Sequence, residues 1–573
     1  MKFLRELIKE ALEESGFAVK NEFSLEHPDE FSHGDYATNA ALIAARDHKK
    51  NPREIASLIA DKIRGKKHPS ISKVEVAGPG FINFFLTPEF FVGEIEKILA
   101  DKKYGANDDL KGKKVMVEYT DMNPFKEFHI GHLMSNSIGE SLSRIYEYSG
   151  ADVVRATYGG DVGLHVAKTI WGLEHKKNEF PGEDEPLSKK ASFLGKCYTF
   201  GANAYEDDEK AKEEIQALNK LIFESLASGA RKNAGEVMKL YDWGRKISLE
   251  HFETVYKKID TKFDYYFFES EVADEGVKIV GEFLGRGVFE KSDGAVVYKG
   301  EQHGLHTRVF INALGIPTYE AKELGLNKLK FKLLPLDQSL IIAASEQIDY
   351  FRVLMRVMGE TIPEIAERTK HISHGMLRFS SGKMSSRKGN VITGEKFIEE
   401  VKGEVAALMK ERGIAEYEKD LAVSVAVAAI RYSMLKQSPG RDIVFDMETS
   451  VSFEGDSGPY LQYSYARTCS LQKRAENEGV APLTERTENP GELERLLYRF
   501  PEIVSRSRIE YSPNLLATYL VRLARTFNSW YGAVTIVNKN DELSHYRLAV
   551  AIATGQVLKN GLHLLGIRAP EKM

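Results

Sequence analysis

The sequence lacks the features that mark several classes of protein. Its 573 residues include only two cysteines, Cys197 and Cys469, far apart in the chain. Two such cysteines exclude a disulfide framework and a cysteine-rich zinc knuckle, so we expect no structural zinc and a reducing, cytoplasmic location. No apolar run reaches the length of a membrane span, and the opening residues MKFLRELIKEALEESGF lack the apolar centre of a signal peptide. We therefore expect no membrane partner.

An excess of positive charge is also missing. The formal net charge is −5, whereas a protein that coats nucleic acid would be basic overall, so any contact with nucleic acid must come from local patches. Composition is otherwise that of a globular protein, with 42% hydrophobic and 28% charged residues. At about 150 residues per domain, the length predicts roughly three or four domains. Composition leaves an enzyme and a binding protein both open.

Residues 115–158 follow the order strand, turn, helix, strand. The stretch opens with the apolar run Val115-Met116-Val117, continues with helical periodicity after His132, and closes with Val153-Val154. This order predicts a βαβ unit, which binds ligands at the carboxyl end of its first strand.

Two histidines, in the motif His129-Ile-Gly131-His132, stand where that helix should begin. At i and i+3 both imidazoles can face one phosphate, because free N–H groups and the helix dipole favour anions there. Gly131 would let a ligand approach the backbone. A metal pair or two surface histidines are the alternatives, although zinc sites on helices usually space histidines i, i+4 beside a glutamate.

Further candidate residues follow other predicted strands. Gly159-Gly160-Asp161 could let a nucleotide approach the backbone, or could be an ordinary loop. Tyr319 and Glu323 share a helix face, and an aromatic ring beside a carboxylate suits a guanidinium group. A surface salt bridge from Glu323 to Lys322 or Lys328 is the simpler alternative. An apolar strand from Leu340 ends in polar residues that include Gln347.

A basic segment lies between Gly375 and Asn390. Three cations and two hydroxyls stand between glycines, a composition suited to clamping a triphosphate and then releasing pyrophosphate. A basic surface loop is the poorer alternative.

The C-terminal region has a helical pattern. Apolar residues step by four, three and four from Leu516 to Phe527, which predicts a buried stripe. Arg522, Arg525 and Trp530 occupy neighbouring faces, where they could pack in a helix bundle or stack on unpaired RNA bases.

Several of these motifs resemble one enzyme family. HIGH at 129–132 and KMSSR at 383–387 resemble the two signatures of class I aminoacyl-tRNA synthetases. The segments EYTDMNPFK, PTYEAKE, GPYLQYSYAR and LATYLVRLARTFNSWYG are similar to arginyl-tRNA synthetases, and HGDYATNAALIAA resembles the additional N-terminal domain that touches the tRNA elbow in that family.

The resemblance implies an α/β fold with a class I Rossmann-type catalytic domain at 106–393, interrupted by an insertion at about 165–300. A small N-terminal α/β domain (1–105), a helical stem (394–455) and an all-α anticodon-binding domain (456–573) are expected around it. The implied reaction is ATP-dependent activation of L-arginine to arginyl-adenylate, followed by transfer to the 3′ end of tRNA(Arg) with release of AMP and pyrophosphate. Mg²⁺ is expected with the nucleotide, and the chain is expected to be a monomer.

The resemblance also implies roles for individual residues. Catalytic roles fall to His129, His132, Lys126, Lys383 and Arg387. ATP binding falls to His129, Gly131, His132, Met376, Lys383, Met384, Ser385 and Ser386. Arginine binding falls to Glu118, Asp121, Asn123, His132, Tyr319, Glu323 and Gln347. Contact with tRNA falls to Tyr460, Gln462, Tyr463, Arg467, Arg522, Arg525 and Trp530.

Three positions depart from the family pattern. Glu323 stands where aspartate is commoner, Asp121-Met122 replaces Ser-Pro, and Ser386 replaces the second lysine of the KMSKS loop. Our hypothesis is that Lys126 supplies the missing charge. Three other functions stay open from sequence: a synthetase for another amino acid, an RNA-binding paralogue that has lost activation, and an adenylating ligase that uses no tRNA.

Overall fold

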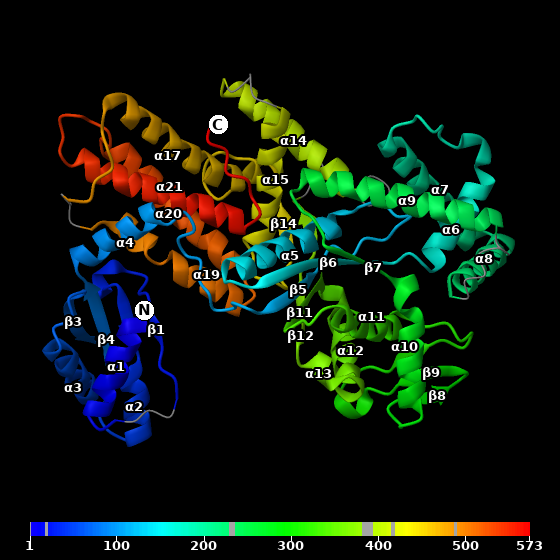
Figure 1. Cartoon of the computed structure of the whole chain (residues 1–573), viewed down its shortest axis with the longest axis horizontal. Coiled ribbons are helices and arrows are strands. Elements are labelled where there is room, and N and C mark those ends of the chain that lie inside the picture. Colours follow the sequence, from blue (N-terminus) through cyan, green and yellow to red (C-terminus); the bar gives the residue numbers. More distant parts are fainter. Residues whose placement is uncertain (1, 18–20, 228–234, 381–392, 414–418, 486–489) are drawn as a thin grey trace.

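A five-stranded parallel sheet forms the centre of the molecule (Figure 1). The structure is a computed structural model that describes residues 2–17, 21–227, 235–380, 393–413, 419–485 and 490–573. The sheet has the order β12-β11-β5-β6-β7, with every neighbouring pair parallel. Its strands are β5 (Lys114–Glu118), β6 (Asp152–Gly159), β7 (Tyr265–Phe268), β11 (Gln338–Ala344) and β12 (Thr369–His374).

The predicted βαβ unit is confirmed. The apolar run at 115–117 is β5, and each of its three residues is at most 1% exposed, as expected for a strand covered on both faces. Helix α5 (Ile130–Tyr148) connects β5 to β6. The chain extends from β5 toward β6 and β7 on one side and later adds β11 on the other, so the topological switch point lies between β5 and β11.

A helical insertion separates β6 from β7. It consists of α6 (Leu164–His175), η2 (Lys177–Glu179), α7 (Leu187–Asp207), α8 (Glu209–Ala227) and α9 (Gly235–Lys258), at the upper right of Figure 1. These helices bury their own hydrophobic cluster, which Phe125 joins from the loop after β5.

The predicted single insertion at 165–300 needs correction because β7 belongs to the central sheet and divides it. A second inserted unit follows β7. The aromatic and β-branched runs at 265–268 and 295–298 favour strands across residues 261–310, but residues 269–284 between them are helical. The elements of this unit are α10 (Glu269–Leu284), β8 (Glu290–Ser292), β9 (Ala295–Tyr298), η4 (Glu301–His303), β10 (Arg308–Ile311) and α11 (Tyr319–Leu333). After β11 come η5 (Ser345–Gln347), α12 (Ile348–Thr361) and α13 (Pro363–Ala366).

The C-terminal part is mainly helical and shares its core with the sheet. One continuous hydrophobic cluster extends from β5 and α5 into α15, α17, α20 and α21, and it contains the predicted stripe from Leu516 to Phe527, whose apolar members are fully buried. The elements are β13 (Leu377–Phe379), α14 (Gly394–Glu411), α15 (Lys419–Leu435), β14 (Ile443–Phe445), α16 (Met447–Ser450), α17 (Gly458–Glu478), α18 (Glu492–Leu497), α19 (Phe500–Ile509), α20 (Pro513–Ala533) and α21 (Ser544–Leu564).

The N-terminal domain has its own core, which Tyr498 joins from the C-terminal part, and docks beneath the C-terminal helices (Figure 1). Asp35 is fully buried there, where it accepts a hydrogen bond from Leu86 N–H at 2.8 Å and pairs with Arg495 of α18. Tyr36 donates to Glu502 of α19 at 2.6 Å. Asp35 therefore joins two domains. The domain contains α1 (Lys2–Glu14), β1 (Leu25–Glu26), η1 (Phe31–His33), β2 (Tyr36–Thr38), α2 (Ala40–His48), α3 (Pro52–Gly65), β3 (Ile71–Ala77), β4 (Phe81–Leu86) and α4 (Pro88–Ala100).

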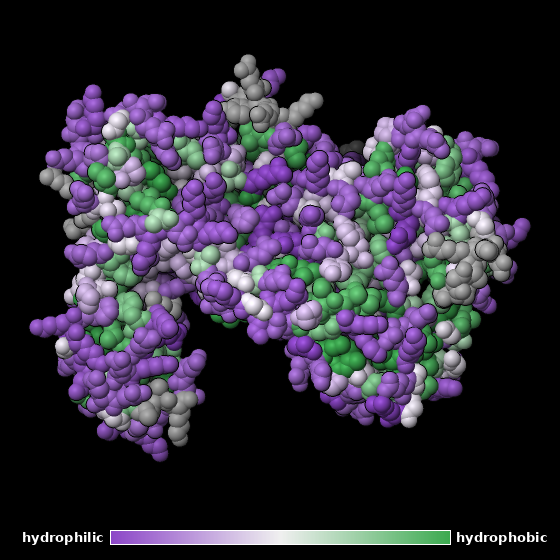
Figure 2. All heavy atoms as spheres, viewed as in Figure 1, coloured by the Kyte–Doolittle hydropathy of each residue, from purple (hydrophilic) through white to green (hydrophobic). Residues whose placement is uncertain are grey.

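The molecular surface is mostly hydrophilic. On the face shown in Figure 2, hydrophobic residues are most visible at the lower right, where Figure 1 places α11 and α12, while charged and polar residues cover most of the rest. Within the described residues, no helix combines the length and apolarity needed to cross a membrane.

Candidate active site

Histidines 129 and 132 meet at the first turn of α5, beside the carboxyl end of β5. Their rings are stacked with centroids 3.7 Å apart. The backbone N–H of His129 donates to Nδ1 of His132 at 3.2 Å, so that nitrogen must be unprotonated and a neutral His132 carries its proton on Nε2. Burial and the neighbouring Lys126 lower the pKa of both imidazoles, that of His132 furthest. Both rings are therefore uncharged hydrogen-bond donors at neutral pH.

The glycine between them packs closely against the ring of His129. A Cβ atom at Gly131 would lie 3.0 Å from Cε1 and Nδ1 of that ring. The sequence suggested that Gly131 makes room for a ligand, and the structure adds that it also makes room for its neighbour.

The segment that follows the basic loop lies against this histidine pair. Thr393 forms an antiparallel bridge with His129, and Gly394 N–H donates to the Phe128 carbonyl at 2.6 Å. The start of the loop is fixed at Ser380, whose N–H donates to the Phe445 carbonyl at 3.0 Å. Five predicted site residues lie outside the described residues: Lys383, Met384, Ser385, Ser386 and Arg387.

Met376 precedes that loop and is 37% exposed. Its backbone N–H donates to Asp442 Oδ1 at 2.9 Å, so the side chain is the part of this residue that remains available to a nucleotide.

Two predicted carboxylates face the same buried region between β5 and α11. Glu118 is 1% exposed and forms an ion pair with Nζ of the fully buried Lys330 at 2.7 Å. Glu323 is 8% exposed. Its burial and the nearby charge of Glu118 raise its pKa to about 8.

The simpler interpretation of Glu323 as half of a surface salt bridge is wrong. Lys322 pairs instead with Glu269 at 2.6 Å, and Lys328 pairs with Glu275 at 2.7 Å. Sequence reasoning missed Lys330, although its position seven residues after Glu323 places both side chains on one face of α11.

The turn after β5 has a strained backbone. Thr120 has φ +80° and Asp121 has φ +44°, and such conformations cost roughly 1–3 kcal/mol each in residues other than glycine. Asp121 Oδ1 accepts a hydrogen bond from Tyr158 N–H at 3.2 Å. Burial and the nearby Glu118 raise the pKa of Asp121 well above its usual value.

Asn123 reaches across to the glycines that end β6. A Cβ atom at Gly160 would lie 2.5 Å from Asn123 Oδ1, so only glycine leaves room for this amide. The adjacent Asp161 is fully buried and accepts hydrogen bonds from Tyr241 at 3.0 Å and from Ser270 Oγ at 2.7 Å. Asp161 therefore joins β6, α9 and α10 behind the site.

His165 belongs to this group and was missed from sequence. Its Nε2 lies 2.7 Å from the Gly160 carbonyl, and burial together with the charge of Lys126 lowers its pKa to about 3. The motif Gly160-Asp161-Val-Gly-Leu-His165 could have identified it, since a glycine-rich turn leads directly into a helix.

Three further predicted residues lie at the edge of the site. Lys126 has a lowered pKa because it is partly buried, and its Nζ lies 5.6 Å from the ring centre of Tyr198 on α7. Tyr319 begins α11 with 57% of its surface exposed, and Gln347 is exposed at the end of β11. The rim of the site thus combines an aromatic ring, an amide and a cation.

The residues expected to contact tRNA divide into two groups. Gln462 is fully buried, and its Nε2 donates to the Arg568 carbonyl at 2.8 Å, while Tyr460 is 9% exposed. The predictions for these two are corrected, because both are enclosed in the helical core. Arg522 lies over the ring of Phe31, at the docked N-terminal domain.

The remaining candidates reach the surface of the C-terminal helices. Arg467 lies between the rings of Tyr463 and Tyr531, with its guanidinium carbon 4.8 and 4.6 Å from their centres. Arg525 is exposed, and Trp530 is partly exposed.

Comparison with known proteins agrees with this architecture. The family model for the class I (R) tRNA synthetase catalytic domain matches residues 94–447, that for the DALR anticodon binding domain matches 461–573, and that for the arginyl tRNA synthetase N-terminal domain matches 2–86.

Similar proteins cover the whole chain. An arginine–tRNA ligase of Fusobacterium nucleatum is 32% identical over 552 residues, covering 94% of this chain and 93% of that protein. One of Thermococcus sibiricus is 30% identical over 638 residues, covering 100% and 98%. The Thermus thermophilus arginyl-tRNA synthetase structure has a TM-score of 0.80 at 24% identity, covering 100% of both chains. The chain therefore belongs to the arginyl-tRNA synthetase family, and it is an arginine–tRNA ligase that activates L-arginine with ATP and transfers it to tRNA(Arg).

Proposed function

We propose that the carboxyl ends of β5 and β11 and the first turns of α11 form a pocket for L-arginine, and that the stacked histidines bind the ATP phosphates beside it. A carboxylate oxygen of arginine attacks the α-phosphorus, the bond to the pyrophosphate oxygen breaks, and arginyl-adenylate forms. A terminal ribose hydroxyl of the tRNA then attacks the arginyl carbonyl, loses its proton and displaces AMP.

The observation that carries this proposal is the charge balance of the pocket. Two buried carboxylates have lysine partners on α11, Glu118 with Lys330 and Glu269 with Lys322. Glu323 has no such ion-pair partner among the described residues, and its burial and the charge of Glu118 raise its pKa. A guanidinium group would supply the missing cation with two parallel hydrogen bonds. Citrulline has no charge and lysine lacks the planar fork, so both would leave the buried carboxylate poorly paired.

The polar groups nearer the rim suit the other end of the amino acid. Asp121, Asn123 and Gln347 follow strands or turns that end at the same edge of the sheet. We assign them to the α-ammonium and carboxylate groups, which fixes the attacking oxygen toward the phosphorus. Tyr319, at the start of α11, covers the side chain of the substrate.

The neutral histidines suit the transition state of the first step. The Nε2–H of His132 and the ring of His129 can donate to the α-phosphate as negative charge spreads over its oxygens. Uncharged donors bind the ground state weakly, so most of their effect appears when charge develops.

Cations complete the nucleotide site. We assign Lys383 and Arg387 of the basic loop, with Ser385 and Ser386, to the β- and γ-phosphates, and Met376 to the nucleotide base. Lys126, beside both histidines, neutralises the departing pyrophosphate. No group of three or more histidine, cysteine, aspartate or glutamate side chains within the described ranges could hold a metal. Mg²⁺ would therefore be held chiefly by the phosphates it accompanies.

The C-terminal helices and the N-terminal domain are assigned to the tRNA. Tyr463, Arg467, Arg525 and Trp530 offer ring faces and guanidinium planes at the surface, on which unpaired bases stack. We further propose that the enzyme acts as a monomer in the cytoplasm.

Substitution of Glu323 tests the arginine pocket. Glu323→Gln keeps the shape of the side chain but removes its charge, so KM for arginine in aminoacylation should rise about a hundredfold while KM for ATP changes little. Glu275→Gln is the matched control, because Glu275 pairs with Lys328 at the surface. An unchanged KM for arginine in Glu323→Gln would rule out this pocket.

Substitution of Lys126 tests the nucleotide side. Lys126→Ala should lower the rate of arginine-dependent ATP–pyrophosphate exchange by about a hundredfold, with little change in KM for arginine. If exchange proceeds at the wild-type rate, the assignment of Lys126 is wrong.

A further inference from the structure

A stripe of buried polar residues on α5 connects the arginine pocket with the C-terminal end of the chain. Asn136, Glu140 and Arg144 are spaced four apart and therefore lie on one face of the helix. The three residues are at most 9% exposed, and each bonds to groups outside the helix. Nothing in the proposed reaction uses them.

The first part of the stripe holds the strained turn after β5. Asn136 Nδ2 donates to Thr120 Oγ1 at 3.1 Å, and Thr120 N–H donates to Ser135 Oγ at 2.9 Å. The preceding residue, Tyr119, donates to Glu140 Oε2 at 2.6 Å. A β-branched residue at φ +80° persists only where its surroundings fix it, and α5 supplies those fixing bonds.

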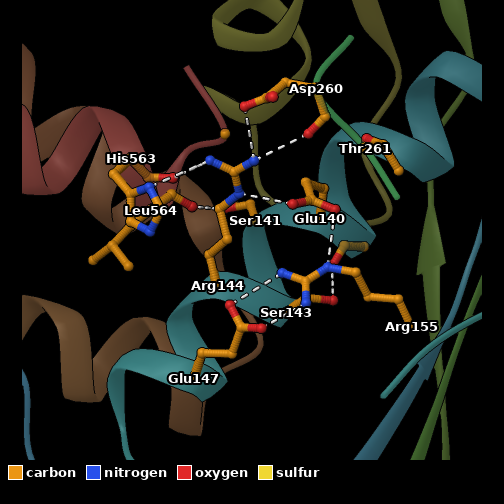
Figure 3. A network of polar contacts seen from close by, with 12 residues as sticks. Glu140, Ser141, Ser143, Arg144, Glu147, Arg155, Asp260, Thr261, His563 and Leu564 are labelled. Carbon is orange, nitrogen blue, oxygen red and sulfur yellow. Dashed lines mark hydrogen bonds and ion pairs between the residues drawn. The ribbon is translucent and has the colours of Figure 1, made fainter. Parts of the chain in front are cut away.

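The second part of the stripe reaches the end of α21 (Figure 3). Arg144 donates to the His563 carbonyl at 3.2 Å and to Asp260 Oδ2 at 3.3 Å, while Glu140 accepts from Arg144 at 2.7 Å and from Arg155 at 3.2 Å. Thus one carboxylate, Glu140, touches both the residue before the strained turn and the cation that holds α21.

A second connection passes through Arg431 of α15. This guanidinium is 2% exposed, and its Nη2 donates to Asn136 Oδ1 and to Thr261 Oγ1, each at 3.1 Å. Its Nη1 donates to the carbonyl of Gly566, beyond the end of α21. A Cβ atom at Gly566 would lie 2.2 Å from that Nη1, so the terminal segment and the Arg431 side chain are in close contact.

We propose that Asn136 and Arg431 are positioning residues that hold the turn at Thr120–Asp121 in its arginine-binding conformation and connect it to the C-terminal segment at 563–568. A displacement of that segment moves Arg431, Arg431 moves the Asn136 amide, and the amide releases the Thr120 hydroxyl. Arginine binding therefore depends on the placement of the C-terminal helices. This inference rests on the proposed assignment of the turn to the amino acid.

Substitutions at Thr120 and Asn136 test the part of this connection that lies nearest the turn. Thr120→Val keeps the shape but loses the hydroxyl, and Asn136→Ala loses the amide; each should raise KM for arginine about tenfold and leave KM for ATP within about twofold. Thr120→Ser retains the hydroxyl and should restore a KM for arginine close to that of the wild type.

A substitution in the C-terminal segment at 563–568 tests the other end of the connection. Gly566→Ala should raise KM for arginine in the same direction, although it lies outside the catalytic domain. Ser143→Ala is the matched control, because Ser143 is also buried on α5 but its Oγ donates to the Gly139 carbonyl of the same helix at 2.8 Å, not to the turn or to the C-terminal segment. Its KM for arginine should equal that of the wild type.

Thermal unfolding and KM for both substrates, measured on the full-length enzyme, separate the outcomes. The proposal is overturned if Asn136→Ala and Thr120→Val lower the Tm but leave KM for arginine unchanged. It is also overturned if KM for ATP rises as much as KM for arginine, because these bonds would then only stabilise the fold. An unchanged KM for arginine in Glu323→Gln would instead reject the arginine pocket itself.

Discussion

At the scale of single residues, the notable group is Glu323, a carboxyl that stays protonated near neutral pH. Its burial and the charge of Glu118 raise its pKa to about 8. A guanidinium group pairs with the ionised form, so binding below that pH must first remove a proton from Glu323. Protonation thus spares Glu323 an unpaired buried charge until a guanidinium group pairs with it.

The raised pKa predicts a pH dependence of arginine binding. As pH rises from about 6.5 to 8, KM for arginine should fall, by up to about tenfold per pH unit, because less free energy is needed to ionise Glu323. KM for ATP should stay nearly constant, since burial keeps His129 and His132 neutral throughout that range. Aminoacylation rates at several pH values measure both. In Glu323→Gln the slope for arginine should disappear, and a slope that survives would assign it to another group.

Individual site residues could be predicted from the sequence where a motif determines the local geometry. His129 and His132 at i and i+3 of a helix start are one such case, and the structure places their rings in contact. Lys330 could not be found this way, because its pairing with Glu118 joins positions far apart in the chain. Gln462 and Tyr460 were misassigned because a helical motif does not show which of its faces is buried.

At the scale of elements, α5 is shaped by the residue that follows β5. A Cβ atom at Gly139 would lie 2.2 Å from Cγ of Tyr119, whose ring packs on the helix and whose hydroxyl bonds to Glu140. A glycine within a helix normally destabilises it, but here glycine permits the contact between strand end and helix.

This contact predicts opposite effects for two glycine-to-alanine substitutions. Gly139→Ala should lower the free energy of unfolding by about 1–3 kcal/mol, because Tyr119 must move. Gly403→Ala, at an exposed position within α14 where a Cβ atom meets nothing within 4 Å, should raise it by about 0.5–1 kcal/mol. Denaturant unfolding followed by circular dichroism measures both. Equal effects at the two positions would contradict the packing argument.

Elements were predicted well where periodicity is strong and poorly where aromatic residues mislead. The apolar run at 115–117 and the leucine stripe of α20 both appear as expected. Residues 269–284 are helical although the tyrosines and phenylalanines just before them favour strands. Only the pairing of β6 with β7 reveals where the helical insertion ends, and that pairing leaves no local signal.

At the scale of the whole molecule, the N-terminal domain is held by charged groups at the edge of its own core. Asp35 is fully buried between Leu86 N–H and Arg495, while His27 Nε2 lies 2.9 Å from Glu502. These bonds join β2 and its neighbours to α18 and α19.

Removal of one cation should loosen this docking. Arg495→Met leaves Asp35 buried without its charge partner, which should weaken domain docking by about 3 kcal/mol. Hydrogen exchange should then become faster at the docked surfaces of residues 21–100 and stay unchanged in the central sheet. Arg506→Met is the control, because Arg506 pairs with Glu510 on the exposed face of α19. This substitution should weaken domain docking by at most about 0.5 kcal/mol. Equal exchange in the two variants would show that apolar packing alone holds the domain.

The continuous hydrophobic cluster that extends from β5 through α5 and α15 to α21 also sets where the chain can be divided. A fragment that stops before α17 would expose the apolar faces of α5 and α15. A fragment that starts at α17 would expose the apolar faces of α17, α20 and α21 that pack on them. The N-terminal domain, which buries a separate cluster, is the natural piece to express alone. Exchanging the C-terminal helices between relatives would therefore require exchanging with them the faces of α5 and α15 on which they pack.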